Sequence, residues 1–214
     1  MGEANTFYHR NLPHWHPVER AIFLTWRLKG SLPLNVINQL RVIRQRMSQC
    51  EASQDGEARV REHKKLFAKM DGILDKAESG PLWLKKTEIG ELIQHALLQQ
   101  YAHLYVLWSY VVMANHSHVL LKPKEGVTIS SITKRIKGAT AREAKILLGR
   151  TGQPFWQDES FDHWCRNGAE LFRVIRYIEN NPVKAGLVDK PENWLWSSAA
   201  ERERRGLVDV QPLT

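Results

Sequence analysis

Two short patterns in the sequence bring together side chains that can do chemistry. The first is His116-Ser117-His118, in which residues two apart point to the same face if the segment is a β-strand. Imidazole is a common ligand of divalent metal ions, so the two rings could hold one ion with a third ligand from elsewhere in the fold. Two surface histidines near a turn would give the same pattern without a metal, and this alternative stays open.

The second pattern is the pair Tyr177 and Asn181, four residues apart in a segment with helical spacing. At this spacing the phenol and the amide lie on adjacent turns of one helix face. Leu171, Ile175 and Ile178 are predicted to form the buried stripe of that helix, with the pair on its flank. A tyrosine at the edge of such a stripe is more often an ordinary core residue, so the pair alone does not define a function.

The elements that must position these residues are predicted from apolar periodicity. Strand-like runs occupy residues 21–28, 103–113 and 118–122, and the last two flank residues 114–117 as an antiparallel pair with a tight connection. Residues 155–165 are aromatic and partly extended. Helical patterns cover residues 34–49, 59–77, 88–100 and 129–148, and a further helix is predicted from the N-cap Asn167 to Asn181. The order of elements predicts an α+β fold with an antiparallel sheet.

The composition is that of a basic globular protein. The chain has 214 residues, 43% apolar and 25% charged, which suffices for one domain with a sizeable core. A net charge of +8 favours a polyanionic partner, nucleic acid first and an anionic membrane surface second. Cys50 and Cys165 form neither a disulfide framework nor a zinc motif, which fits a reducing cytosol. No apolar run suits a signal peptide or a membrane span, so we expect a cytoplasmic protein.

The two chemical patterns lie in segments that resemble one known family. Residues 110–122, YVVMANHSHVLLK, closely resemble the histidine-pair strand of the REP-associated tyrosine transposases, which are single-tyrosine HUH transposases with an IS200-like domain. Residues 176–188, RYIENNPVKAGLV, resemble the tyrosine motif of the same family. Three further segments are similar and occur in the same order, namely KGATAREAK, FWQDESFDHWCRN and WLWSSA.

The resemblance runs from about residue 15 to residue 200 and implies an overall architecture. That architecture is an HUH-type ferredoxin-like antiparallel sheet flanked by helices, with a helical insertion after the first strand. We therefore expect one domain over residues 15–200, an insertion over residues 34–80, and terminal extensions over residues 1–14 and 201–214. Residues 34–80 carry no chemical signal, and we assign them to packing or to DNA contact without preference.

The resemblance also implies roles for individual residues. His116 and His118 match the family's metal-binding pair, Asn181 matches the third metal ligand, and Tyr177 matches the nucleophile. The implied activity is that of a metal-dependent single-stranded DNA endonuclease and strand transferase. It would act on hairpin, REP-like palindromic DNA through a 5′-phosphotyrosine intermediate, with Mg²⁺ or Mn²⁺ as cofactor.

Two departures from the family pattern fall near the histidine pair. Ala114 stands where the family often has proline, and Ser117 stands where the family has a hydrophobic residue. Neither departure changes a metal ligand.

The expected partner is single-stranded or hairpin DNA in a nucleoid-associated protein that can form a homodimer. We interpret one face of the helix at residues 129–148 as a phosphate-binding surface, although a solvated basic face explains the pattern equally well. The residues of this surface are Lys134, Arg135, Lys137, Arg142 and Lys145. Glu159 and His163 are predicted to support the metal ligands or to contact DNA.

Two other functions stay open. A domesticated, non-catalytic DNA-binding protein would keep the fold, although the presence of both histidines, the tyrosine and the asparagine argues mildly against it. A His-x-His phosphoesterase acting on nucleotides fits less well. A histidine-triad hydrolase needs a further histidine at position 120, which is Leu120, and a two-motif phosphoesterase needs a second His-x-Ser/Thr, which the sequence lacks.

Overall fold

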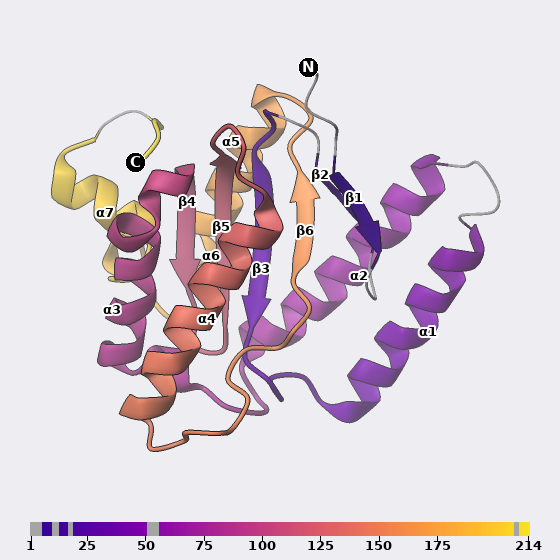
Figure 1. Cartoon of the computed structure of the whole chain (residues 1–214), viewed down its shortest axis with the longest axis horizontal. Coiled ribbons are helices and arrows are strands. Elements are labelled where there is room, and N and C mark those ends of the chain that lie inside the picture. Colours follow the sequence, from indigo (N-terminus) through magenta and orange to yellow (C-terminus); the bar gives the residue numbers. More distant parts are fainter. Residues whose placement is uncertain (1–5, 10–12, 17–18, 51–55, 208–209) are drawn as a thin grey trace.

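The computed structural model describes residues 6–9, 13–16, 19–50, 56–207 and 210–214. A four-stranded sheet lies at the centre of this part of the chain (Figure 1). Every pair of neighbouring strands is antiparallel, which confirms the predicted α+β fold with an antiparallel sheet. In spatial order the strands are β4 (Tyr105–Val112), β5 (His116–Pro123), β3 (Ile22–Arg27) and β6 (Phe161–Trp164).

The connection between β4 and β5 is shorter than the sequence pattern predicts. The predicted strand begins at His118, but β5 begins at His116, because the Met113 N–H bonds the His116 carbonyl at 2.8 Å and closes a tighter hairpin. In register with β3, His118 lies opposite Thr25 and His116 lies opposite Arg27. Both histidines are therefore strand residues of the central sheet and point to one face of it.

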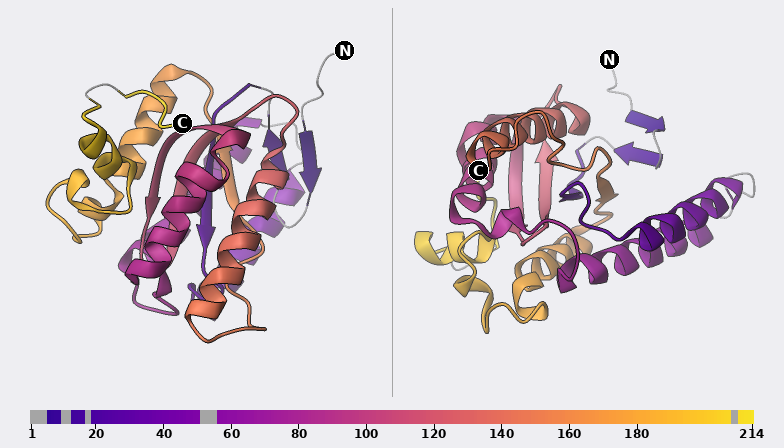
Figure 2. Two further views of the ribbon diagram at one scale, coloured as in Figure 1. Left: turned by 60° about the vertical axis from the view of Figure 1, so that its left-hand side comes forward. Right: turned by 90° about the horizontal axis from the view of Figure 1, so that it is seen from below.

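Helices cover both faces of the sheet. In the described ranges the α-helices are α1 (Leu34–Cys50), α2 (Gly56–Lys76), α3 (Thr87–His95), α4 (Ile129–Leu147), α5 (Gly168–Glu179), α6 (Asn181–Lys184) and α7 (Ser198–Arg205). Alternate residues of β3 separate two cores: Leu24 packs with α3 and α4, whereas Phe23 packs with α2 and α5. Figure 2 shows these two helical layers on opposite sides of the strands. No helix of the described ranges combines the length and the apolar character that crossing a membrane requires.

Further elements lie near the two ends of the chain. A two-stranded sheet, which the sequence pattern does not predict, joins β1 (Thr6–His9) and β2 (Pro13–His16). The rest of the extension predicted over residues 1–14 lies outside the described residues. At the other end, the Leu213 N–H donates to the Leu107 carbonyl at 2.7 Å, and the Leu213 side chain is buried in the core.

Helices α1 and α2 form an arm that leaves the sheet after β3, where a helical insertion is expected (Figure 1). We call residues 34–76 the α1–α2 arm. Its buried side chains, including Leu40, Leu66 and Leu74, belong to the same core as Phe23. The two ends of the arm lie close together. A β-carbon added at Gly80 would lie only 2.2 Å from the Gly30 carbonyl oxygen.

Gly80 is expected to be indispensable for this close approach of the two ends. Its φ of +77° lies in the left-handed region, and Gly80→Ala would also force a β-carbon into the Gly30 backbone. We expect the free energy of unfolding to fall by about 2 kcal/mol or more. Urea denaturation followed by circular dichroism measures this change. Gly126→Ala is the matched control, because Gly126 also has a positive φ but nothing lies within 4 Å of its added β-carbon. Equal losses in the two variants would show that the close approach to Gly30 adds nothing.

Candidate functional site

The two histidines of β5 are fully buried and lie side by side. Their ring centroids are 4.7 Å apart. On each ring the Nδ1 atom is held by a neighbour: His116 Nδ1 lies 2.7 Å from Asn115 Oδ1, and His118 Nδ1 lies 2.8 Å from Thr25 Oγ1. Because an amide oxygen only accepts hydrogen bonds, His116 Nδ1 carries the proton, and its Nε2 is left with a lone pair. A hydroxyl both donates and accepts, so the Thr25 contact orients the His118 ring and is compatible with either tautomer.

Two carboxylates from the α1–α2 arm face the Nε2 atoms of the two rings. Asp71 Oδ1 lies 3.1 Å from His118 Nε2, and Asp75 Oδ1 lies 3.6 Å from His116 Nε2. The two aspartates are one helical turn apart on α2, which places both carboxylates on the face that packs against β5. Residues 34–80 carry no recognised chemical motif, so neither aspartate is predicted from the sequence. The available signal is the i, i+4 spacing of two acids beside the apolar residues Met70 and Leu74.

The protonation of this cluster follows from burial and charge. Burial lowers the pKa of His116 to about 3, with a further contribution from His118, so its imidazole is neutral. Burial alone would raise the pKa of Asp71, but the hydrogen bond and charge of His118 outweigh it and bring this pKa below its usual value. The pKa of Asp75 is raised, first by burial and then by the charge of Asp71. Lys184 partly compensates, because its Nζ lies 2.7 Å from Asp75 Oδ2 and 3.8 Å from Asp71 Oδ2.

The donor set of the cluster suits a divalent metal ion. One nitrogen of His116, one of His118 and one oxygen of Asp71 all lie within 4.8 Å of one another. These atoms are buried, and two of them, His118 Nε2 and Asp71 Oδ1, lie 3.1 Å apart. Without a proton between them, an imidazole nitrogen and a carboxylate oxygen are both acceptors, and a metal ion in place of that proton would satisfy both. Two imidazoles and a carboxylate can therefore bind a metal here.

Tyr177 reaches the same cluster from α5. Its hydroxyl donates a hydrogen bond to Asp71 Oδ2, and its ring centroid lies 5.7 Å from that of His118. Burial, followed by the charge of Asp71 and this hydrogen bond, raises the pKa of Tyr177 well above its usual value. The phenol is therefore protonated in this state. Lys184 Nζ lies 5.7 Å from the centre of the same ring, which places a cation beside the phenol.

Asn181 lies beyond a break in the helix that is predicted to be continuous from Asn167 to Asn181. The Asn167 side chain caps α5 as predicted, accepting from the Glu170 N–H at 2.9 Å. However, α5 ends at Glu179, and Asn181 opens the short helix α6, because Pro182 fits only the first turn of a new helix. Asn181 is fully buried, and neither polar atom of its amide has a hydrogen-bond partner among the described residues. Its amide lowers the pKa of Tyr177, against the larger effects of burial and Asp71.

Of the two residues predicted to support the site, His163 lies closer to Tyr177. His163 Nε2 lies 3.0 Å from Glu170 Oε1, and both side chains line a cavity that Tyr177 also lines. Glu159 lies in the segment before β6, where it lines a larger cavity of about 720 Å³ beneath α4. The structure thus groups His163 with the tyrosine, whereas Glu159 lies between the large cavity and a smaller one lined by Thr25 and Phe67.

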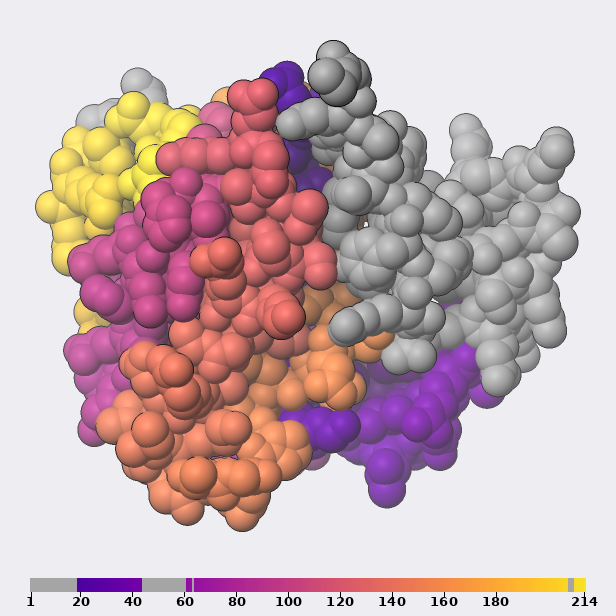
Figure 3. Space-filling view, viewed as in Figure 1, coloured from indigo at the N-terminus to yellow at the C-terminus, as the bar shows by residue number. Residues whose placement is uncertain are grey.

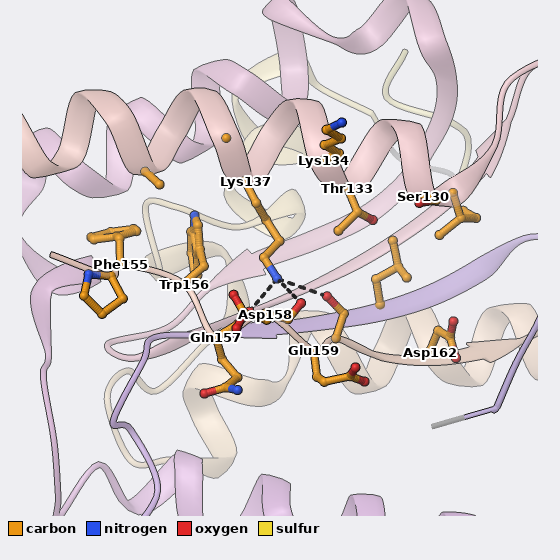
Figure 4. A pocket seen from close by; sticks show the side chains of 16 residues that line it. Ser130, Thr133, Lys134, Lys137, Phe155, Trp156, Gln157, Asp158, Glu159 and Asp162 are labelled. Atoms are coloured by element: carbon orange, nitrogen blue, oxygen red, sulfur yellow. Dashed lines mark hydrogen bonds between the residues drawn. The ribbon is translucent and has the colours of Figure 1, made fainter. Parts of the chain in front are cut away.

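The predicted basic surface lies on the other side of the sheet. Helix α4 packs in the core opposite to the one that holds Tyr177, on the face turned toward the viewer in Figure 3. Lys134, Arg135 and Arg142 are exposed there. Lys137 instead points into the large cavity, where its Nζ donates to the carbonyls of Gln157 and Asp158 at 2.6 and 3.0 Å (Figure 4). A role of this surface in DNA binding stays a prediction.

Lys137 and Lys134 are expected to respond differently to the same substitution. Lys137→Met removes a cation that bonds two carbonyls, so we expect the free energy of unfolding to fall by about 2 kcal/mol. Lys134→Met, on the exposed surface of the same helix, should change it by less than about 0.5 kcal/mol. Chemical denaturation of both variants measures the difference. Equal effects would contradict the structural role of Lys137.

Comparison with known proteins identifies the central part of the chain. Residues 85–181 match the family model "Transposase IS200 like". This segment is therefore similar to the IS200-like transposase domain, in agreement with the resemblance seen in the sequence, and it contains His116, His118, Tyr177 and Asn181. The aspartates of α2 lie outside it.

Solved structures and curated sequences extend the comparison. The structure of a REP-associated tyrosine transposase bound to a REP hairpin is similar with a TM-score of 0.55 and 18% identity, covering 98% of this chain and 90% of that one. At this identity the likeness shows a shared fold. A provisionally assigned transposase from Deinococcus radiodurans has a TM-score of 0.32 and 16% identity. The alignment covers 78% of this chain and 93% of that one. A comparison with curated protein sequences finds no significant match.

Proposed function

We propose that the protein is a metal-dependent single-stranded DNA endonuclease and strand transferase that uses Tyr177 as its nucleophile. The observation that carries this proposal is the convergence of a tyrosine hydroxyl and two imidazole nitrogens on one buried cluster. The matched family model supports DNA transposition as the setting. Proteins rarely bury several polar side-chain atoms without hydrogen-bond partners. Such atoms are typical of metal-binding and other functional sites.

The residues at hand fit a metal centre of Mg²⁺ or Mn²⁺. His116 and His118 would hold the ion through their Nε2 atoms, and the third ligand would be Asn181 or Asp71. Asn181 has a buried, unpartnered amide, and Asp71 has an oxygen that already faces His118. When bound, the ion supplies positive charge that stabilises the developing charge on the scissile phosphate. Asn115 fixes the tautomer of His116, and Thr25 orients the ring of His118, which is the usual role of the neighbours of ligating histidines.

Tyr177 would perform the covalent step. Its phenol oxygen attacks the scissile phosphorus in line, a P–O bond to tyrosine forms, and the bond to the 3′ oxygen breaks. The phenolic proton is lost and the 3′ oxygen gains one, which leaves a 5′-phosphotyrosine and a free 3′-hydroxyl. The energy of the broken bond is kept in the new one, so the free hydroxyl can reverse the step or be replaced by another strand. Asp71 holds the phenol oxygen in position before DNA enters.

The proposed partner is hairpin-bearing single-stranded DNA. The net charge of +8 favours a polyanion. The similar solved structure is described as bound to a REP hairpin, and we infer the same class of ligand for this chain. A protein that acts on such DNA is expected in the cytoplasm, associated with the nucleoid, and we extend the proposal to a homodimer.

A covalent-trapping assay tests the activity. The protein is incubated with hairpin-bearing single-stranded DNA and Mn²⁺, denatured, and run on a gel. We expect a protein–DNA adduct that survives denaturation and is absent when EDTA is added. DNA that binds in a native gel but never forms an adduct would instead support the non-catalytic alternative.

A further inference from the structure

A cavity of about 190 Å³ opens beside the Tyr177 ring. It lies between α2, α5 and the strands β3 and β6. Aromatic rings form its walls, and these belong to Phe23, Phe67, Phe161 and Tyr177. Phe67 belongs to the α1–α2 arm, outside the residues that match the family model. The cavity therefore joins the arm to the proposed nucleophile.

The aromatic walls are arranged as a stacking platform. The centroids of Phe67 and Phe161 lie 4.3 Å apart with their planes tilted by 34°. Phe23 meets the Tyr177 ring edge-on, with centroids 6.0 Å apart. A cavity of about 150 Å³ is sufficient to hold benzene, so the space beside Tyr177 accommodates a planar ring. Ring faces of this kind attract the π-faces of unstacked nucleobases.

One side of the cavity is polar and rigid. The His163 ring lies there, fixed by its contact with Glu170 at 3.0 Å. Glu170 is itself held, because its Oε2 accepts from the Arg166 N–H at 2.9 Å. Lys64 adds an exposed cation at the rim. A planar apolar slot with one polar edge and a nearby cation matches the three parts of a nucleotide: base face, base edge and phosphate.

We propose that this cavity receives one unpaired nucleobase of the DNA strand, from a nucleotide next to the phosphate that Tyr177 attacks. The inference rests on the proposed function, because Tyr177 is both the nucleophile and one wall of the cavity. A base can enter only if it is unstacked and unpaired, so the cavity selects a single-stranded flank over a duplex. His163 contacts the edge of the base and acts as a specificity-determining residue. The α1–α2 arm contributes to substrate binding through Phe67.

Equilibrium binding to DNA with single missing bases tests this proposal. The probe is a fluorescein-labelled hairpin with a twelve-nucleotide single-stranded flank, in which each flanking nucleotide is made abasic in turn. Binding is measured by fluorescence anisotropy, with Mn²⁺ and with the Tyr177→Phe protein so that no DNA is cleaved. We expect one abasic position to weaken binding about tenfold. Combining Phe67→Ala with Tyr177→Phe should reduce that penalty to less than about twofold.

Two further variants, made in the same Tyr177→Phe protein, separate the cavity from general effects on folding. Val174 lines the cavity, so Val174→Phe fills it and should make intact DNA bind as weakly as the abasic DNA. Phe172 lies on the same helix but is exposed and outside the cavity, so Phe172→Ala should behave like the parent. An abasic penalty that survives in both cavity variants, or that is found at no position, overturns the inference. Failure of the proposed function is seen separately, as the absence of an adduct with the unmodified protein.

Discussion

Replacing Tyr177 by phenylalanine is expected to abolish the covalent protein–DNA adduct. The substitution removes only the phenolic oxygen, which is the atom proposed to form the bond to phosphorus. Strand cleavage should fall by at least about a thousandfold, which is typical for the loss of a nucleophile. The denaturing gel measures both quantities, because the adduct migrates more slowly than free DNA and cleaved strands migrate faster.

The binding and folding of the Tyr177→Phe variant serve as its controls. Native gels should show hairpin DNA bound as before, since the ring and its contacts with Phe23 remain. The variant loses the hydrogen bond to Asp71, so we expect the free energy of unfolding to fall by about 2 kcal/mol. Tyr101→Phe is the matched substitution of a tyrosine outside the site and should form the adduct like the wild type. An adduct that persists in Tyr177→Phe would exclude Tyr177 as the nucleophile.

The second large effect is expected on metal binding. Substitution of His118 by alanine removes a buried imidazole whose Nε2 faces the cluster, and the affinity for Mn²⁺ should fall by at least about a hundredfold. Isothermal titration calorimetry measures this affinity without any DNA. In wild type, Mn²⁺ at about a hundred times its dissociation constant should stabilise the fold by about 2.7 kcal/mol. This stabilisation should disappear in His118→Ala.

The same titration distinguishes the two candidates for the third ligand. Asp71→Asn keeps the size of the side chain but removes its charge, and Asn181→Ala removes the amide. We expect the variant that lacks the true ligand to lose most of its Mn²⁺ affinity and the other to keep it within about tenfold. His163→Ala is the control, because His163 contacts Glu170 rather than the histidine pair. Unchanged Mn²⁺ affinity in His118→Ala would remove the histidine pair from the metal centre.

The sequence predicts the elements that carry their own local signals. Runs rich in β-branched and aromatic residues identify β3 and the β4–β5 pair, and the cap at Asn167 correctly marks the start of α5. Element ends are predicted less well: β5 begins two residues early, at His116, and Pro182 begins a new helix instead of simply stopping the old one. Local rules thus recover the framework on which the histidines and the tyrosine lie.

Contacts between segments that are distant in the sequence cannot be predicted from such local patterns. Asp71 approaches Tyr177 across 106 positions of the chain, and no periodicity in either segment indicates it. The basic face of α4 is a real helix face, but the sequence cannot tell which side of the sheet it covers. The structure places α4 opposite the histidine pair because Ile132 and Ile136 pack on the Leu24 side of β3. Such choices depend on the packing of the whole fold.

The contact between Gly30 and Gly80 has an evolutionary consequence. Since the two ends of the α1–α2 arm meet, the path of the chain through the sheet is the same with or without the arm. Such a segment can be gained or lost in a single genetic event without rerouting the fold. Yet it brings Asp71 to the histidines and Phe67 to the cavity beside Tyr177. Under the roles proposed for these residues, one insertion therefore alters the metal environment and the recognition of DNA together, and relatives without the arm should differ in both.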